Sequence, residues 1–291
     1  MIVMAGCSET YDVHPKLSSI DPIVESSIEE RSTELSVDPS NPNNPVDSIG
    51  EIHNELLDAI AFNEGFDTLD IMDFLFEYVV EEKGWEVDEK LSNSSADSMV
   101  NVIWEYCIEV DLEEDFTGLI DEFSTAFAYS QTLTNHLESL FSLLDYARED
   151  VPISDLIDSI IVKEDLFSTA VVTASESLIF YGTASILRYS AAYWEAVIED
   201  ESSSHPFYTV VVSHLMDLDE NINSDDIVDV RKWNWKKFWR GLAVIGADAL
   251  GFAGGYAFGS SLSGGLPAAG IAAGTLIGGA TSGMVRDAWE P

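Results

Sequence analysis

The chain has 291 residues, enough for one or two domains, and its 53 acidic and 13 basic residues give a net charge of −40. Such a chain repels nucleic-acid phosphates and attracts cations and basic proteins, so we exclude a nucleic-acid-binding protein. Hydrophobic residues make up 46% of the sequence, which excludes a disordered polyanion, and two cysteines are too few for a disulfide framework.

The N-terminal region has the pattern of a lipoprotein. Met4-Ala5-Gly6-Cys7 is similar to a bacterial lipobox, so Cys7 is the candidate lipidation site, and we expect residues 1–7 to be a partial lipoprotein signal. Residues 8–45 are rich in Ser, Asp, Glu, Pro and Asn and lack helical periodicity. That composition predicts a disordered acidic tether between the lipid and the folded domain.

Residues 46–230 are predicted to form an acidic helical domain. Ser48-Ile-Gly-Glu51 has the spacing of a capping box, and apolar residues follow it at helical intervals. Period-two alternation is confined to Thr209–Val212, which is too short to build a sheet. The fold class is therefore all-α, a bundle of about six to eight helices. Further helical patterns span residues 68–83, 95–110, 117–147, 168–198 and 207–218, and Pro152 opens another helix.

Residues 231–291 are predicted to form a Gly/Ala-rich helical hairpin. Glycine in a helix interior costs about 1 kcal/mol relative to alanine, yet 13 of the 19 glycines lie between Gly241 and Gly283. Residues four apart share a helix face, so this spacing predicts a glycine zipper between two arms, residues 243–262 and 267–285, or a seam between copies of the chain. The zipper glycines are Gly251, Gly255, Gly259, Gly270, Gly274 and Gly278.

Aromatic and basic side chains precede the hairpin, as is typical of a membrane interface. Each arm is about 30 Å long, which matches the hydrocarbon core of a bilayer. Asp248 argues against a span, because a carboxylate in lipid costs a few kcal/mol. The alternative is a soluble hairpin packed against the acidic domain. The candidate interface residues are Trp233, Trp235, Lys236, Lys237, Trp239 and Arg240.

Motifs for catalysis or metal binding are missing from the sequence. The five histidines form no zinc-binding pair, and nucleophile-elbow and phosphate-loop patterns are absent. Residues 217–225 imitate the alternating oxygens of a calcium loop but lack its glycine and its final glutamate. We expect no enzyme, no cofactor and no metal. His53, Asn54 and Asp248 are the candidate polar site, with a helix-surface or capping role for His53 as the alternative.

Three short features together resemble a group of uncharacterised Bacteroidota lipoprotein-like proteins. They are Asn41–Pro45 leading into Ile49–Asn54, the segment Arg188–Trp194, and Ala247–Gly251 at the start of the glycine-rich region. The resemblance implies a lipid-anchored helical protein of the bacterial cell envelope with a Gly/Ala-rich C-terminus. It implies no activity, but it makes the carboxylate of Asp248 a designed feature of that pattern.

Two functions remain open from the sequence. The first is a non-enzymatic, lipid-tethered envelope protein whose zipper hairpin packs in or on a membrane, with oligomeric or bacteriocin-like action as an extension. The second is a soluble envelope interaction module whose hairpin belongs to the packed helical core. The expected partners are membrane lipid, a second copy through the zipper, and cations or a basic protein on the acidic domain.

Overall fold

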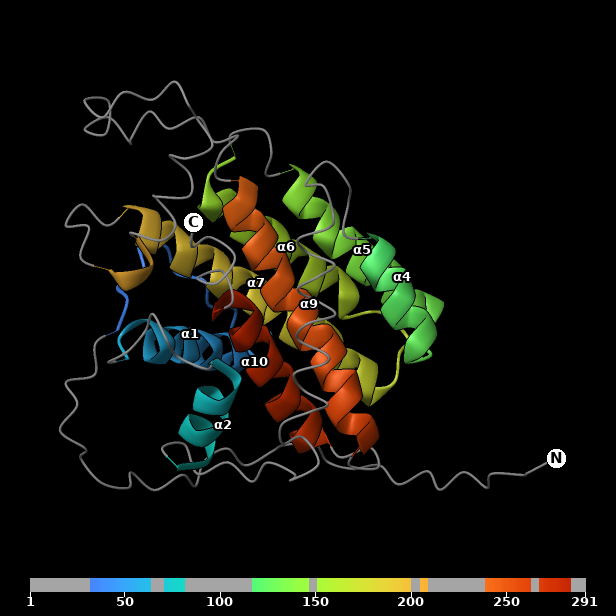
Figure 1. Cartoon of the computed structure of the whole chain (residues 1–291). Helices are drawn as coiled ribbons and strands as arrows, with labels where there is room; N and C mark the ends of the chain where they lie inside the picture. Colours follow the sequence, from blue (N-terminus) through green and yellow to red (C-terminus); the bar gives the residue numbers. More distant parts are fainter. Residues whose placement is uncertain are drawn as a thin grey trace. The chain divides into compact units, whose positions relative to one another are not determined.

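The computed structural model describes residues 32–63, 71–81, 117–146, 151–199, 205–208, 239–262 and 267–283 (Figure 1). These residues all lie within one compact unit, Ser32–Pro291. The regular structure in these ranges is helical and contains no strand. The predicted fold class, an all-α bundle with a C-terminal Gly/Ala-rich helical hairpin, is confirmed.

The helix α7 forms the centre of the packing. It is 26 residues long, and α1, α6 and α9 pack directly against it. The two C-terminal helices pack along each other, and α10 also contacts α1 and α2 (Figure 1). The described helices are α1 (Ser48–Ala61), α2 (Ile71–Glu81), α4 (Thr117–Ala126), α5 (Gln131–Tyr146), α6 (Ile153–Phe167), α7 (Ala174–Glu199), α9 (Trp239–Leu262) and α10 (Pro267–Gly283).

The first helix is amphipathic, but it begins differently from the prediction. Leu56, Leu57 and Ile60 are fully buried, whereas Glu51 is exposed, so the apolar stripe faces the core. The predicted capping box is wrong. Ser48 is already helical, and the preceding residue makes no side-chain cap hydrogen bond.

The predicted continuous pattern over residues 117–147 is two helices, α4 and α5. The chain breaks between them at residues 127–130, where Ala128 has a φ of 54° in the left-handed region. Ser130 then starts α5, because its Oγ accepts a hydrogen bond of 3.2 Å from the amide of Leu133. A short hydroxyl side chain therefore opens a new helix inside an apparently regular apolar pattern.

A capping box starts α7 later than the apolar pattern predicts. Thr173 Oγ1 accepts a hydrogen bond of 3.2 Å from the amide of Glu176, and Oε2 of Glu176 accepts one of 2.9 Å from the amide of Thr173. This reciprocal pair satisfies two amides at the helix start. The helix therefore begins at Ala174 and not at about Ser168.

Part of the predicted tether belongs to the folded unit. Residues 32–47 run across α1, α6 and α7, and we call this segment the strap. Asn41 and Asn44 of the strap are only 2% and 5% exposed. The predicted boundary at Val46 is therefore corrected to Ser32, whereas residues 8–31 lie outside the described ranges.

The C-terminal helices form a tight antiparallel pair. A Cβ atom on Gly255 would lie 2.9 Å from the carbonyl oxygen of Ala273, and one on Gly278 would lie 2.9 Å from that of Asp248. A side chain at either position would displace backbone, so the two helices depend on glycine there. None of the described helices combines the length and apolar character that a membrane crossing requires.

Candidate functional site

Four polar side chains meet where α1, α7 and α9 pack together, and we call them the polar centre. Ser190 Oγ donates a hydrogen bond of 2.6 Å to Asp248 Oδ2. His53 Nε2 lies 3.5 Å from the same carboxylate oxygen, and His53 Nδ1 lies 3.2 Å from Oδ1 of Asn54. Asn54 in turn donates 3.0 Å to the carbonyl of Tyr189. The structure thus brings together His53, Asn54 and Asp248, the three residues of the predicted polar site.

Burial sets the charge state of the polar centre. His53 is fully buried, and desolvation lowers its pKa to about 4, against a smaller opposing effect of the Asn54 hydrogen bond. His53 is therefore neutral near pH 7. Since the amide nitrogen of Asn54 donates elsewhere, its Oδ1 accepts the proton of Nδ1. The lone pair of Nε2 then faces Asp248, and Nε2 has no hydrogen-bond partner among the described residues.

The polar centre contains the residue types of a hydrolytic triad but not its connectivity. In a triad the histidine lies between the serine and the carboxylate, whereas here Asp248 lies between Ser190 and His53. All three side chains are 0% exposed. A substrate therefore has no route to the serine hydroxyl in this arrangement. What the geometry can do is fix the register of α9 against α7 through the directional hydrogen bond from Ser190 to Asp248.

A buried arginine holds the strap against the central helix. The guanidinium of Arg188 on α7 donates to the backbone carbonyl of Pro39 and pairs with the carboxylate of Asp47, both in the strap. On its other side it donates 3.2 Å to Oε1 of Glu164 on α6. Arg188 is fully buried. We call Arg188, Asp47 and Glu164 the clamp, because together they join three segments far apart in the sequence.

Two asparagines of the strap donate hydrogen bonds to the buried carboxylate of the clamp, Glu164. Asn41 and Asn44 donate hydrogen bonds of 2.7 and 2.6 Å to the two carboxylate oxygens of Glu164. Desolvation raises the pKa of Glu164, and Arg188 and the two amides oppose that shift. Buried charges are tolerated only where partners satisfy them in this way. The strap therefore supplies two of the hydrogen-bond donors that allow the Glu164 carboxylate to be buried.

A second histidine cluster fastens the beginning of the strap. Thr33 Oγ1 donates 2.6 Å to Oδ1 of Asp58 on α1 and lies 3.0 Å from Nε2 of His205. The hydroxyl of Tyr193 on α7 donates 3.0 Å to the same carboxylate oxygen. Burial, and then the Asp58 charge, raise the pKa of Tyr193 well above its ordinary value, so the phenol stays protonated and donates.

The remaining predicted site residues fall into three groups. Cys7, Trp233, Trp235, Lys236 and Lys237 lie outside the described ranges. Trp239 and Arg240 are the first two residues of α9. The glycines Gly255, Gly270, Gly274 and Gly278 line the contact between α9 and α10, and Gly251 and Gly259 are buried on α9.

Sequence reasoning missed Ser190 and the clamp. Arg188 was detectable, because it is one of only 13 basic residues and stands among small and aromatic side chains of a helical pattern. A cation in such a stretch needs an anionic partner. Asp47 and Glu164, however, are two of 53 acidic residues, and nothing local distinguishes them.

Comparison of the chain with protein-family models, with curated proteins and with solved structures gave no match. In the described part of the chain, no group of three His, Cys, Asp or Glu side chains could hold a metal ion.

Proposed function

We propose that the chain is a non-enzymatic cell-envelope protein whose helical unit, hairpin included, is an interaction module, tethered through lipid on Cys7. The observation that carries this proposal is the burial of Asp248 between α1 and α7. Asp248 carries the one carboxylate of α9, is 0% exposed and accepts a hydrogen bond from Ser190. This contact supports a hairpin that belongs to the core, with the acidic outer surface as the face that meets partners.

The charge of the chain indicates the kind of partner. A net charge of −40 produces a negative potential that favours cationic ligands and basic proteins. Exposed carboxylates such as Glu51, Glu55, Glu77 and Glu122 lie on the outer faces of three different helices. We therefore propose a cation or a basic protein as the partner, and no nucleic acid.

Hydrogen exchange of the purified full chain tests the place of the hairpin. We expect the amides of α9 and α10 to be protected as strongly as those of α7 in lipid-free buffer. Adding vesicles of phosphatidylethanolamine and phosphatidylglycerol should leave that protection unchanged. Rapid exchange in α9 and α10 without lipid, with protection appearing only on vesicles, would refute the core assignment.

The tether is tested separately by carbonate extraction of cell membranes. We expect the intact chain to stay with the membrane pellet and the Cys7→Ala variant to be released. Retention of Cys7→Ala would remove the lipid from the proposal and require another attachment to the envelope.

In a second candidate function, the hairpin packs in or on a membrane, or against the hairpin of a second copy of the chain. The observation that favours it is the backbone approach of α9 and α10 at Gly255, Gly274 and Gly278. Helices α9 and α10 pack closely enough to stay paired outside the bundle, because small residues at a helix interface also hold helices together in lipid. Permeability of dye-loaded vesicles tests it, and a bacteriocin-like action requires dye release that Gly274→Leu abolishes.

A further inference from the structure

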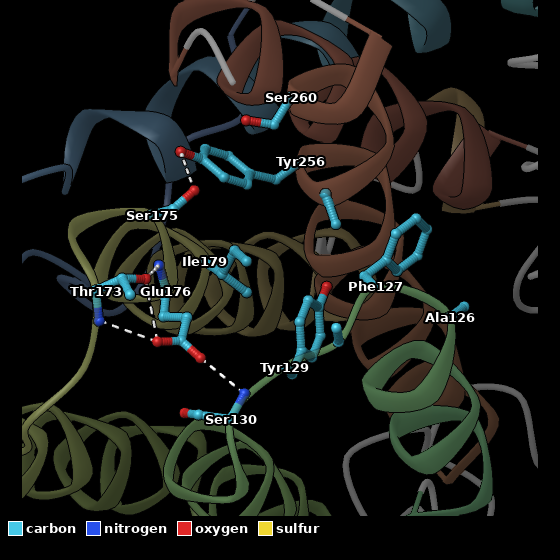
Figure 2. Close-up of a pocket in the computed structure, with 12 residues that line it drawn as sticks. Ala126, Phe127, Tyr129, Ser130, Thr173, Ser175, Glu176, Ile179, Tyr256 and Ser260 are labelled. Carbon is cyan, nitrogen blue, oxygen red and sulfur yellow. Dashed lines mark hydrogen bonds between the residues drawn. The ribbon is translucent and has the colours of Figure 1, made fainter. Parts of the chain in front are cut away.

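A pocket of about 640 Å³ opens between the turn joining α4 and α5, the first turns of α7 and the second half of α9 (Figure 2). Its volume is in the range of small-molecule sites. The rings of Phe127 and Tyr129 line one side of it, and Ile179 lies between Glu176 and Tyr256 (Figure 2). The carboxylate of Glu176 lies at the opposite edge from Tyr256 (Figure 2).

The turn geometry positions the aromatic wall. The rings of Phe127 and Tyr129 lie 6.1 Å apart and nearly parallel, at 28°. Ala128 between them has a left-handed φ of 54°, a conformation that costs a non-glycine residue free energy. The hydroxyl of Tyr129 donates 2.9 Å to the carbonyl of Ala253 on α9, so the ring is anchored at its far end.

The carboxylate of Glu176 is fixed and ionised. It accepts hydrogen bonds of 2.8 Å from the amide of Ser130, 2.9 Å from the amide of Thr173 and 3.0 Å from the hydroxyl of Thr173. Partial burial opposes ionisation, but these hydrogen bonds outweigh it and hold the pKa of Glu176 below its ordinary value. Within the described ranges no basic side chain forms an ion pair with it.

The far end of the pocket carries hydroxyl groups. The hydroxyl of Tyr256 lies 3.3 Å from Oγ of Ser175, and Ser260 lies beside them (Figure 2). The pocket therefore has an anionic end, an aromatic and aliphatic middle, and a neutral polar end.

We propose that this pocket binds an organic ammonium ion carried on an apolar body. The ammonium group donates to Glu176 and lies against the rings of Phe127 and Tyr129, and the apolar body contacts Ile179 and Tyr256. Charge-assisted hydrogen bonds and cation–π contacts both favour a cation here, and the negative potential of the chain raises its local concentration. The inference deepens the proposed interaction role by naming a ligand class, and it rests on that role.

The test is a ligand-observed NMR titration of the full chain at low salt with phenethylamine and with its neutral isostere 2-phenylethanol. We expect phenethylamine to bind about tenfold more tightly than the alcohol, the effect of one charge-assisted hydrogen bond. Glu176→Gln should remove that preference. Glutamine is also accepted at this capping position, so the helix start remains intact.

Two further variants separate the pocket from general cation attraction. Glu122→Gln removes one exposed charge on α4, outside the residues that line the pocket, and should leave phenethylamine binding unchanged. Ala257→Phe fills the pocket from α9 and should abolish binding while keeping every charge. Equal loss of affinity in both glutamate variants, or unchanged binding in Ala257→Phe, would overturn the proposal.

The source of the ammonium group is distinguished by a second probe, Nα-acetyl-lysine methylamide. Tighter binding of this probe than of phenethylamine assigns the site to a lysine side chain of a protein, and weaker binding assigns it to a small amine. Failure of both probes to bind refutes the pocket. It leaves the hydrogen-exchange result, and with it the core assignment of the hairpin, untouched.

Discussion

Asp248 of α9 and His53 of α1 face each other across 3.5 Å, and both side chains are completely shielded from solvent. The carboxylate also accepts the hydroxyl proton of Ser190, so it connects three helices at one point. One carboxylate therefore gives α9 a polar contact with both α1 and α7 within a run of glycine, alanine and aromatic residues.

Two substitutions of Asp248 test whether its hydrogen bond, and not only its packing, stabilises the fold. Asp248→Leu leaves the buried Ser190 hydroxyl without its acceptor, and we expect it to lower the free energy of unfolding by about 1–3 kcal/mol. Asp248→Asn can accept from Ser190 and donate to the lone pair of His53 Nε2, so its loss should stay below about 1 kcal/mol. Urea unfolding measures both, and a more stable Asp248→Leu variant would contradict the assignment.

His53 should make the stability depend on pH between about 4 and 6.5. Its pKa is about 4 in the folded chain and 6.5 in the unfolded chain, so in this window the unfolded chain binds more protons. Stability therefore falls as the pH falls, by up to about 3 kcal/mol in total. His53→Gln should be less dependent on pH in this window. Urea unfolding at pH 7, 5.5 and 4.5 gives the difference between the two chains, and parallel pH profiles would refute the prediction.

The glycines of α10 should differ in their tolerance of a methyl group. Gly274→Ala would place Cβ 2.9 Å from the carbonyl oxygen of Phe252, and we expect a net loss of about 1–3 kcal/mol. Gly279→Ala is the matched control on the same helix, since its Cβ would meet the side chain of Leu56 at 3.3 Å. It should be neutral, or stabilising by up to about 1 kcal/mol through helix propensity. In thermal unfolding, Gly279→Ala should therefore melt at a higher temperature than Gly274→Ala.

The clamp should be sensitive to the shape of the cation as well as its charge. Arg188→Met leaves the carboxylates of Asp47 and Glu164 unpaired, and we expect a loss of about 3–5 kcal/mol. Arg188→Lys keeps the charge but lacks the planar fork, so it should be intermediate. The double variant Arg188→Met with Glu164→Gln should recover part of the loss, because it removes one uncompensated charge. A fully additive result in a double-mutant cycle would contradict the clamp.

The turn between α4 and α5 should become more stable with glycine. The left-handed conformation of Ala128 destabilises the folded chain by about 1–2 kcal/mol, and glycine removes this strain. Glycine also gives the unfolded chain more conformational entropy, which lowers the free energy of unfolding by about 0.4–1 kcal/mol. Ala128→Gly should therefore raise the free energy of unfolding by about 0.5–1 kcal/mol. If the strain positions the rings of Phe127 and Tyr129, the same variant should weaken phenethylamine binding. Higher stability with unchanged binding would show that the strain has no role in the pocket.

Helical periodicity and glycine spacing predicted the bundle and its C-terminal hairpin, because both are local properties of the chain. The predicted arms of the hairpin end within a few residues of the observed α9 and α10 in the described ranges. The starts of α1, α5 and α7 were mispredicted for a different reason. Each depends on which partner a short polar side chain binds, and apolar periodicity carries no information about that choice.

The candidate site was predictable only in part. Asp248 stood out as a carboxylate in a Gly/Ala-rich arm, and His53 stood out beside Asn54 as a polar pair on the first helix. Asp47 illustrates what could not be foreseen. Its position favours a helix cap, yet its carboxylate binds Arg188, which is 141 residues away. One acidic residue among 53 can be assigned to such a partner only when the fold has brought the two together.

The contact between α1 and α10 has a consequence for biosynthesis. The first described helix packs against the last, so translation must pass residue 283 before the core can close. A nascent chain that ends at α7 lacks α10, whose Gly279 lies against the side chain of Leu56 on α1. The contact between α1 and α10 therefore forms late, because α1 can be covered by α10 only after both helices have been synthesised.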